Sequence, residues 1–162
     1  MYEILEVTAP EEINEVRSLF LEYANWLDFS LCFQGFDKEL AELPGKYSPP
    51  HGRLYLAISE GRYAGCIGLR RFDDGICEMK RLYVRPEFRG LSIGNGLIQK
   101  IIADAKVIGY EKMRLDTIKE RMGKAVEIYR EFGFVEIDAY YDNPNPHTLY
   151  MELDLKQTNG IV

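Results

Sequence analysis

Histidine and cysteine are scarce in this sequence, and each scarcity excludes a kind of site. The two histidines, His51 and His147, lie far apart and form no His-Glu-x-x-His motif. We therefore expect no catalytic metal site. The three cysteines, Cys32, Cys66 and Cys77, form no Cys-x-x-Cys pair. Because the last two lie in strand-like runs, we expect buried free thiols rather than disulfides or metal ligands.

Long hydrophobic runs and an excess of positive charge are also missing. No stretch of 18 apolar residues occurs and the N-terminus does not resemble a signal peptide, so we expect a cytoplasmic protein without a membrane partner. The 20 lysines and arginines are outnumbered by 26 aspartates and glutamates, and the net charge is −6. This balance argues against a nucleic-acid partner, because few cations are left to neutralise phosphates.

The 162 residues fit one domain, which we expect over residues 1–156, with a frayed tail over 157–162. Apolar residues that alternate predict strands, and apolar residues at a period near 3.6 predict helices. The pattern indicates an α/β (α+β) protein whose mixed sheet is flanked by helices. The expected strands are 2–7, 53–59, 63–72, 76–84, 112–117, 134–141 and 149–155, and the expected helices are 10–27, 36–43, 93–108 and 121–132.

The most informative stretch is the loop from Arg89 to Gly94, which follows a predicted strand and opens a predicted helix. The first N–H groups of a helix have no partner within it, and glycines let a phosphate approach them closely. An arginine adds a charge-assisted donor. An ordinary strand-to-helix turn is the alternative. Neither the spacing of a Rossmann site nor that of a Walker loop is present.

The segment Val84–Gly94 resembles the acetyl-CoA-binding motif of the GNAT superfamily of N-acetyltransferases, [R/Q]-x-x-G-x-[G/A]. Arg89 and Gly94 match it, while Ser92 stands where the family usually has glycine and could instead cap the helix. The order of elements is also that of the GNAT fold, with a mostly antiparallel sheet of about seven strands. The resemblance implies acetyl-CoA as co-substrate, held by Leu82, Tyr83, Val84, Arg89, Gly90, Leu91, Ser92, Ile93, Gly94 and Lys124.

The same resemblance implies catalytic roles for two further residues. Tyr129 lies in a segment similar to the family's A-x-x-x-Y-x-x-x-G-F, whose tyrosine is the general acid for the thiolate. Glu78 lies at the register where some members place a catalytic base, although a solvated strand face explains it equally well. Met122 stands where the family often has asparagine.

The acceptor is a small amine or a protein amine, and the sequence does not choose between them. Trp26, Phe29, Phe33, Tyr140 and Tyr141 could form an aromatic cage for an ammonium group, or could belong to the core or to a homodimer contact. The expected function is acetyl transfer from acetyl-CoA to a primary amine by direct attack in a ternary complex. A non-enzymatic acyl-CoA sensor, or a transferase that uses another acyl-CoA, is the alternative.

Overall fold

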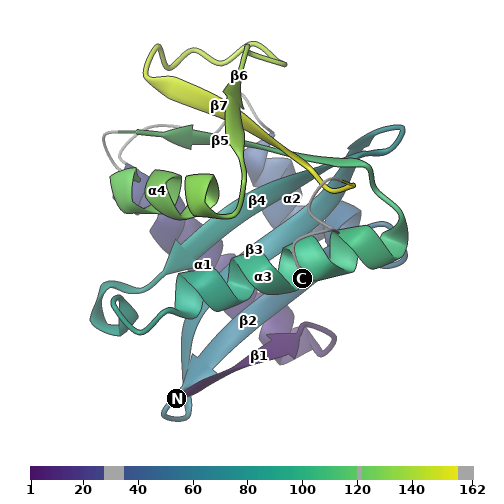
Figure 1. Cartoon of the computed structure of the whole chain (residues 1–162). Coiled ribbons are helices and arrows are strands. Elements are labelled where there is room, and N and C mark those ends of the chain that lie inside the picture. Colours follow the sequence, from purple (N-terminus) through teal and green to yellow (C-terminus); the bar gives the residue numbers. More distant parts are fainter. Residues whose placement is uncertain (28–34, 120–121, 157–162) are drawn as a thin grey trace.

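A computed structural model describes residues 1–27, 35–119 and 122–156 of the chain (Figure 1). In these residues a seven-stranded sheet has the strand order β1-β2-β3-β4-β5-β7-β6. Its strands are β1 (Tyr2–Glu6), β2 (Arg53–Ser59), β3 (Arg62–Asp73), β4 (Ile76–Val84), β5 (Lys112–Ile118), β6 (Val135–Ile137) and β7 (Thr148–Asp154). The α-helices are α1 (Pro10–Leu27), α2 (Phe36–Glu42), α3 (Ile93–Ile108) and α4 (Gly123–Glu131), and the short 3₁₀ helices are η2 (Gly45–Tyr47) and η3 (Pro86–Phe88).

Sheet pairing is antiparallel except between β4 and β5, which run parallel. Short turns join β2 to β3 and β3 to β4, whereas the parallel pair needs the crossover through α3. The expected mixed, mostly antiparallel sheet with flanking helices is thereby confirmed.

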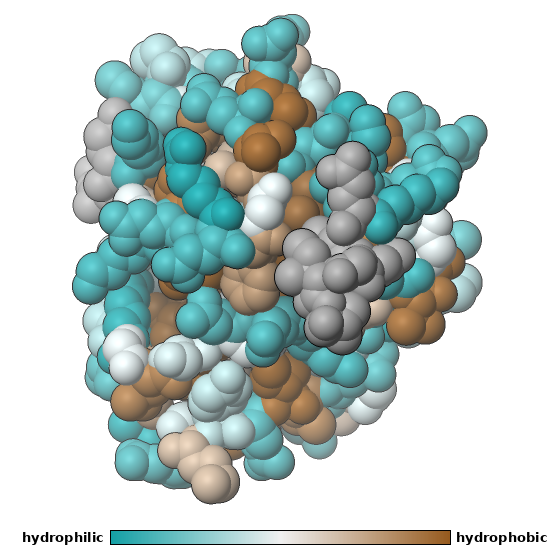
Figure 2. Space-filling model, in the orientation of Figure 1, coloured by the Kyte–Doolittle hydropathy of each residue, from teal (hydrophilic) through white to brown (hydrophobic). Residues whose placement is uncertain are grey.

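Helices cover both faces of the sheet (Figure 1). One hydrophobic core lies between the sheet and α3 and α4, where Leu97, Ile98 and Ile101 are fully buried. A second core lies on the opposite face, where α1 contributes Val16 and Phe20. On the face shown in Figure 2, hydrophobic side chains form separate patches among hydrophilic ones.

The last part of the chain departs from the sequence prediction. A strand was expected over 134–141, but β6 ends at Ile137. The reason lies in two tyrosines beyond it, because Tyr140 and Tyr141 direct their hydroxyl groups to Glu78 and Asp116 instead of continuing the strand. The segment between β6 and β7 therefore packs against the middle of the sheet.

The two described cysteines, Cys66 and Cys77, are buried free thiols, as expected. Burial raises the pKa of both thiols well above the ordinary value. Cys32 lies outside the described residues. None of the helices in the described part of the chain is long and apolar enough to span a membrane. The described residues also contain no group of three His, Cys, Asp or Glu side chains that could hold a metal ion.

Candidate active site

The sheet opens between β4 and β5. The two strands pair over three residue pairs, of which Glu78–Arg114 is the last. Beyond this pair β4 continues to Val84 and β5 to Ile118, and the strands diverge toward α4 (Figure 1). Among the described residues no strand pairs with the facing edges in this opening, an arrangement that suits an extended ligand with amide groups.

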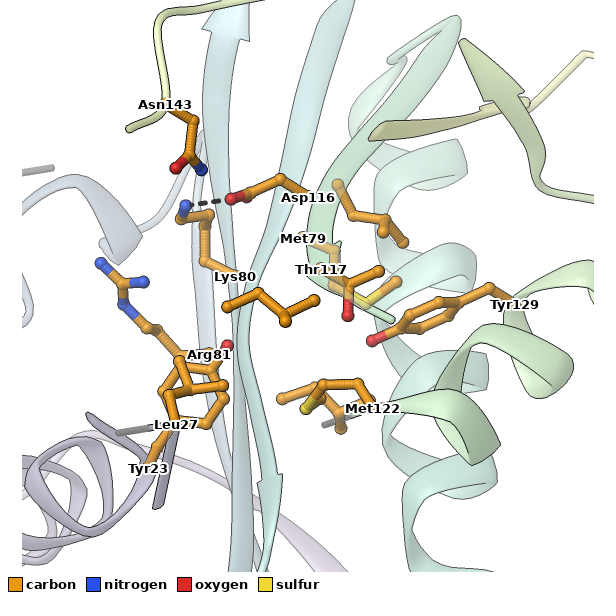
Figure 3. Close-up of a pocket in the computed structure, with 13 residues that line it drawn as sticks. Tyr23, Leu27, Met79, Lys80, Arg81, Asp116, Thr117, Met122, Tyr129 and Asn143 are labelled. Carbon is orange, nitrogen blue, oxygen red and sulfur yellow. Dashed lines mark hydrogen bonds and ion pairs between the residues drawn. The ribbon is translucent and has the colours of Figure 1, made fainter. Parts of the chain in front are cut away.

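A β-bulge in β4 lies within the opening. The register with β3 shifts between Lys80 and Tyr83, so that Arg81 and Leu82 together face Ile67. Arg81 has a positive φ of 61°. Bulges bend a strand and re-aim its side chains, and they are frequent beside active sites. Here the adjacent side chains of Lys80 and Arg81 both turn toward the α1 side of the sheet (Figure 3).

A cleft of about 640 Å³ lies between the end of β4 and the first turns of α3 and α4. It gathers all of the residues predicted to bind acetyl-CoA except Leu91, whose side chain is 52% exposed away from the lining. Phe88, Asn95 and Ile128 also line it and were not singled out from the sequence. The predicted residues in the lining are Leu82, Tyr83, Val84, Arg89, Gly90, Ser92, Ile93, Gly94 and Lys124.

The loop before α3 leaves open space beside the helix N-terminus. A Cβ added at Gly94 would meet no atom within 4 Å, so nothing in the protein itself requires glycine there. Ser92 makes no side-chain cap bond, and the expected capping role is wrong. Its φ of 64° is left-handed, which costs a non-glycine residue about 1–2 kcal/mol. This geometry explains why a motif of this kind favours glycine at the position of Ser92.

Arg89 reaches across the cleft. Its Nε donates a hydrogen bond of 2.9 Å to the backbone carbonyl of Val84. Its guanidinium carbon lies 5.0 Å from the ring centre of Trp26 and 5.9 Å from that of Tyr83. Arg89 and Lys124 place two cations on the cleft walls, where they can neutralise phosphate groups.

A smaller cavity of about 30 Å³ lies next to the cleft, in the gap between β4 and β5. Leu82 and Met122 line both spaces. Tyr129 of α4 directs its hydroxyl group toward this gap (Figure 3), and burial raises the pKa of the phenol above its ordinary value. Nearby, the buried Oγ1 of Thr117 has no hydrogen-bond partner among the described residues.

Glu78 lies deeper, below the point where the strands part. Its side chain is 1% exposed, and Oε1 accepts hydrogen bonds of 3.0 and 2.8 Å from the Arg70 guanidinium. Oε2 accepts a bond of 2.7 Å from the Tyr140 hydroxyl. Glu78 does not belong to the lining of the cleft or of the small cavity. Its role as a base stays a prediction.

Asp116 of β5 is the carboxylate that does line the small cavity, and the sequence analysis missed it. Oδ1 lies 3.3 Å from Lys80 Nζ, and Oδ2 accepts a hydrogen bond of 2.5 Å from the Tyr141 hydroxyl, which in turn accepts one from Asn143. Burial alone would raise the pKa of Asp116, but the charge of Lys80 and these hydrogen bonds hold it below the ordinary value.

Of the five aromatic residues considered for a cage, the three described ones lie in two different places. Trp26 lines the cleft beside Arg89. The rings of Tyr140 and Tyr141 are tilted against each other with centres 5.4 Å apart, and their hydroxyl groups bond to buried carboxylates. Phe29 and Phe33 lie outside the described residues.

A mixed sheet that splits beside a glycine-containing helix N-terminus, with a buried tyrosine at the split, is the arrangement that the resemblance to the GNAT acyltransferases implied. The Acetyltransferase (GNAT) family model matches residues 13–134. The chain therefore belongs to the GNAT family of N-acetyltransferases, and it is an enzyme of that type.

A relative agrees with this assignment, and solved structures share the fold. An uncharacterized N-acetyltransferase of Schizosaccharomyces pombe is 41% identical over 95% of this chain and 95% of its own length. An acetyltransferase of the GNAT family from Staphylococcus aureus has a TM-score of 0.79 and 22% identity, over 96% of this chain and 99% of that one. The PaiA N-acetyltransferase from Thermoplasma acidophilum, solved in complex with coenzyme A, has a TM-score of 0.73 and 20% identity, over 95% and 99%.

Proposed function

We propose that the chain transfers the acetyl group of acetyl-CoA to a primary amine by direct attack in a ternary complex. The observation that carries this proposal is a pair of neighbouring spaces that share Leu82 and Met122 in their linings. One lies at the N-terminus of α3, and the other lies between the split strands beside Tyr129. A donor with a phosphate end and a thioester end matches these two spaces.

Donor binding rests on backbone and cationic groups. The unpartnered N–H groups at the start of α3 suit a pyrophosphate, and the open space beside Gly94 admits it. Arg89 and Lys124 supply positive charge. The pantetheine arm has amide groups that can pair with the free edge of β4 near Leu82 and Val84, in the manner of an added strand.

The chemistry needs two proton movements. The amine nitrogen attacks the thioester carbon, the C–S bond breaks, and the amine proton leaves to solvent or a base. Tyr129 gives its proton to the departing sulfur, so that CoA leaves as a thiol. A phenol is protonated at neutral pH, which a general acid requires, and burial, which raises the pKa of Tyr129, does not change that. Backbone N–H groups of the bulged strand can stabilise the oxyanion that forms before the C–S bond breaks.

Calorimetric titration with acetyl-CoA tests the donor part of the proposal, with NAD as the control ligand. We expect selective binding of acetyl-CoA. Arg89→Gln should weaken it by roughly tenfold or more, because one charge-assisted hydrogen bond is lost. The matched control is Arg71→Gln, since Arg71 is half exposed and pairs with Asp74 in the β3–β4 turn. Equal binding of NAD and acetyl-CoA would show that the cleft is not a CoA site. Tighter binding of longer acyl-CoAs would favour another donor.

A further inference from the structure

Trp26, near the end of α1, lies beside the guanidinium group of Arg89, although the two residues are far apart in the sequence. The guanidinium carbon is 5.0 Å from the centre of the Trp26 ring and 5.9 Å from that of the Tyr83 ring. At both distances a cation is attracted to the face of an aromatic ring, and the attraction is strongest for tryptophan. The flat guanidinium of an arginine can also stack on such a ring. Trp26 and Tyr83 therefore restrict where Arg89 places its charge.

A hydrogen bond fixes how this guanidinium is turned. The Nε of Arg89 donates to the carbonyl oxygen of Val84 at 2.9 Å. The bond uses one N–H donor and leaves the two terminal amino groups, which can bind two phosphate oxygens at once. Arg89 and its partners Val84, Tyr83 and Trp26 all line the cleft. Because a long side chain loses conformational freedom when it binds a ligand, an arginine that is already held in place binds a pyrophosphate at a lower entropic cost.

The position of Trp26 is supported by contacts between α1 and the end of β4. Glu22, one helical turn before Trp26, accepts hydrogen bonds of 2.6 and 3.0 Å from Arg85, the residue that follows β4. Arg85 also donates a hydrogen bond of 3.2 Å to Glu15, which lies further back on α1. Residues four apart in a helix lie on the same face. These bonds therefore keep Trp26 beside Tyr83, with ring centres 6.4 Å apart.

We propose that Trp26 is a positioning residue for the donor, which holds the Arg89 guanidinium so that its terminal amino groups face the pyrophosphate of acetyl-CoA. This inference rests on the proposed function, because it needs a donor with phosphate groups in the cleft. Trp26 itself lines the cleft, so direct contact between the indole ring and the donor is the competing explanation. The two explanations differ in what they predict for a donor without phosphate and for a variant that lacks both side chains.

The first test compares acetyl-CoA with S-acetylpantetheine, which keeps the thioester and the amide groups but has no phosphate. Calorimetric titration of Trp26→Leu should show a Kd for acetyl-CoA that is higher by about two- to fivefold, the value of one exposed cation–π contact. The Kd for S-acetylpantetheine should not change. An equal loss with both donors would indicate direct contact or a general structural role, and would overturn the proposal. Leu21→Ala is the control, because Leu21 lies on the same helix, is 46% exposed and lines neither space.

The second test combines Trp26→Leu with Arg89→Gln. A residue that acts only through another has no further effect once the other has been removed. The double variant should therefore bind acetyl-CoA as Arg89→Gln does. If the two losses multiply instead, Trp26 acts independently of Arg89 and the proposal is wrong. Trp26→Phe keeps an aromatic face, so it should bind acetyl-CoA more tightly than Trp26→Leu when Arg89 is present, and equally when Arg89 is replaced.

A third measurement leaves Trp26 in place, and it decides even if Trp26→Leu does not fold. Trp26 is the only tryptophan of the chain, so the indole fluorescence of the protein reports on this one ring. Pairing of Arg89 with phosphate changes the charge beside the ring. Saturating acetyl-CoA should therefore change the emission of the unmodified enzyme, and should change that of Arg89→Gln much less. An equal change in both proteins, or no change in either, would overturn the proposal.

Failure of the positioning role differs from failure of the proposed function. If the unmodified protein binds acetyl-CoA and Arg89→Gln weakens this binding while Trp26→Leu does not, the proposed function stands and Trp26 has no positioning role. If the unmodified protein does not bind acetyl-CoA, the proposed function fails, and the positioning role fails with it.

Discussion

The variant Gly94→Ala should change the stability of the protein and its affinity for acetyl-CoA in opposite directions. The added Cβ meets no protein atom within 4 Å, and alanine is favoured over glycine in a helix by up to about 1 kcal/mol. We therefore expect the free energy of unfolding to rise by about 0.5–1 kcal/mol, which corresponds to a Tm higher by about 1–4 °C for a chain of this size.

The same Cβ enters the space proposed for the pyrophosphate. A displaced phosphate loses one charge-assisted hydrogen bond, about 1.5–3 kcal/mol, so the Kd for acetyl-CoA should rise by roughly ten- to a hundredfold. Thermal unfolding without ligand gives the first quantity, and calorimetric titration gives the second. A general structural disturbance would lower both the stability and the affinity, whereas this variant should raise the stability and lower the affinity.

Gly96→Ala, two residues further along α3, is the matched control. There the added Cβ would lie 2.1 Å from the Tyr2 hydroxyl, which donates a hydrogen bond to the carbonyl of Ser92. Displacing Tyr2 costs about 1 kcal/mol for that bond and offsets the gain in helix propensity. We expect Gly96→Ala to be less stable than Gly94→Ala, with nearly unchanged affinity for acetyl-CoA. Unchanged affinity of Gly94→Ala, or an equal loss in both variants, would refute the assigned phosphate position.

Three further predictions concern the acid, the loop and the buried charges. Tyr129→Phe should lower kcat by about 10²–10⁴-fold while calorimetry shows the same affinity for acetyl-CoA; full activity would exclude this acid. Ser92→Gly removes a positive φ from a serine and should raise the free energy of unfolding by up to about 1 kcal/mol in urea titrations, since glycine's own entropy cost offsets part of the relief; a loss of stability would indicate a side-chain contact. Although burial alone would raise it, hydrogen bonds and the charge of Arg81 hold the pKa of Glu39 below its ordinary 4.5. The stabilisation by Glu39 is therefore complete above pH 4.5 and lost as the pH falls through its lower folded-state pKa. Glu39→Gln should cost about 3–5 kcal/mol at pH 7, and this difference from the unmodified enzyme should shrink below pH 4.5; a constant difference would contradict the pairing.

Many of the helix and strand boundaries depend on nearby residues, and they could therefore be predicted from the sequence. The helices α3 and α4 are followed by Gly109 and Gly133, whose positive φ values suit glycine and end each helix where the sequence predicts. The β6 strand was overestimated because the apolar run continues through Tyr140 and Tyr141. Only the folded chain brings their hydroxyl groups to buried carboxylates distant in the sequence, and no local pattern reports that contact.

The candidate site also has one part that the sequence predicts and one part that only the tertiary structure shows. The cleft proposed for the donor is built largely from one continuous segment around Arg89, so the motif pointed to most of its lining. The opposite end depends on residues from separate strands that meet only in the tertiary structure. Asp116 and Thr117 are ordinary strand residues in the sequence, and they become notable because β4 and β5 part beside them. The β4 bulge that re-aims Lys80 is likewise a property of the pairing with β3.

The most direct measurement of the central claim is acetyl-CoA-dependent product formation with a mixture of amino acids and simple amines, followed by thiol release and mass spectrometry together. The account predicts one equivalent of free CoA for each N-acetylated amine, and the near loss of both signals in Tyr129→Phe. Binding of acetyl-CoA without CoA release in the presence of any amine would contradict it and would favour a protein that binds acyl-CoA without transferring the acyl group.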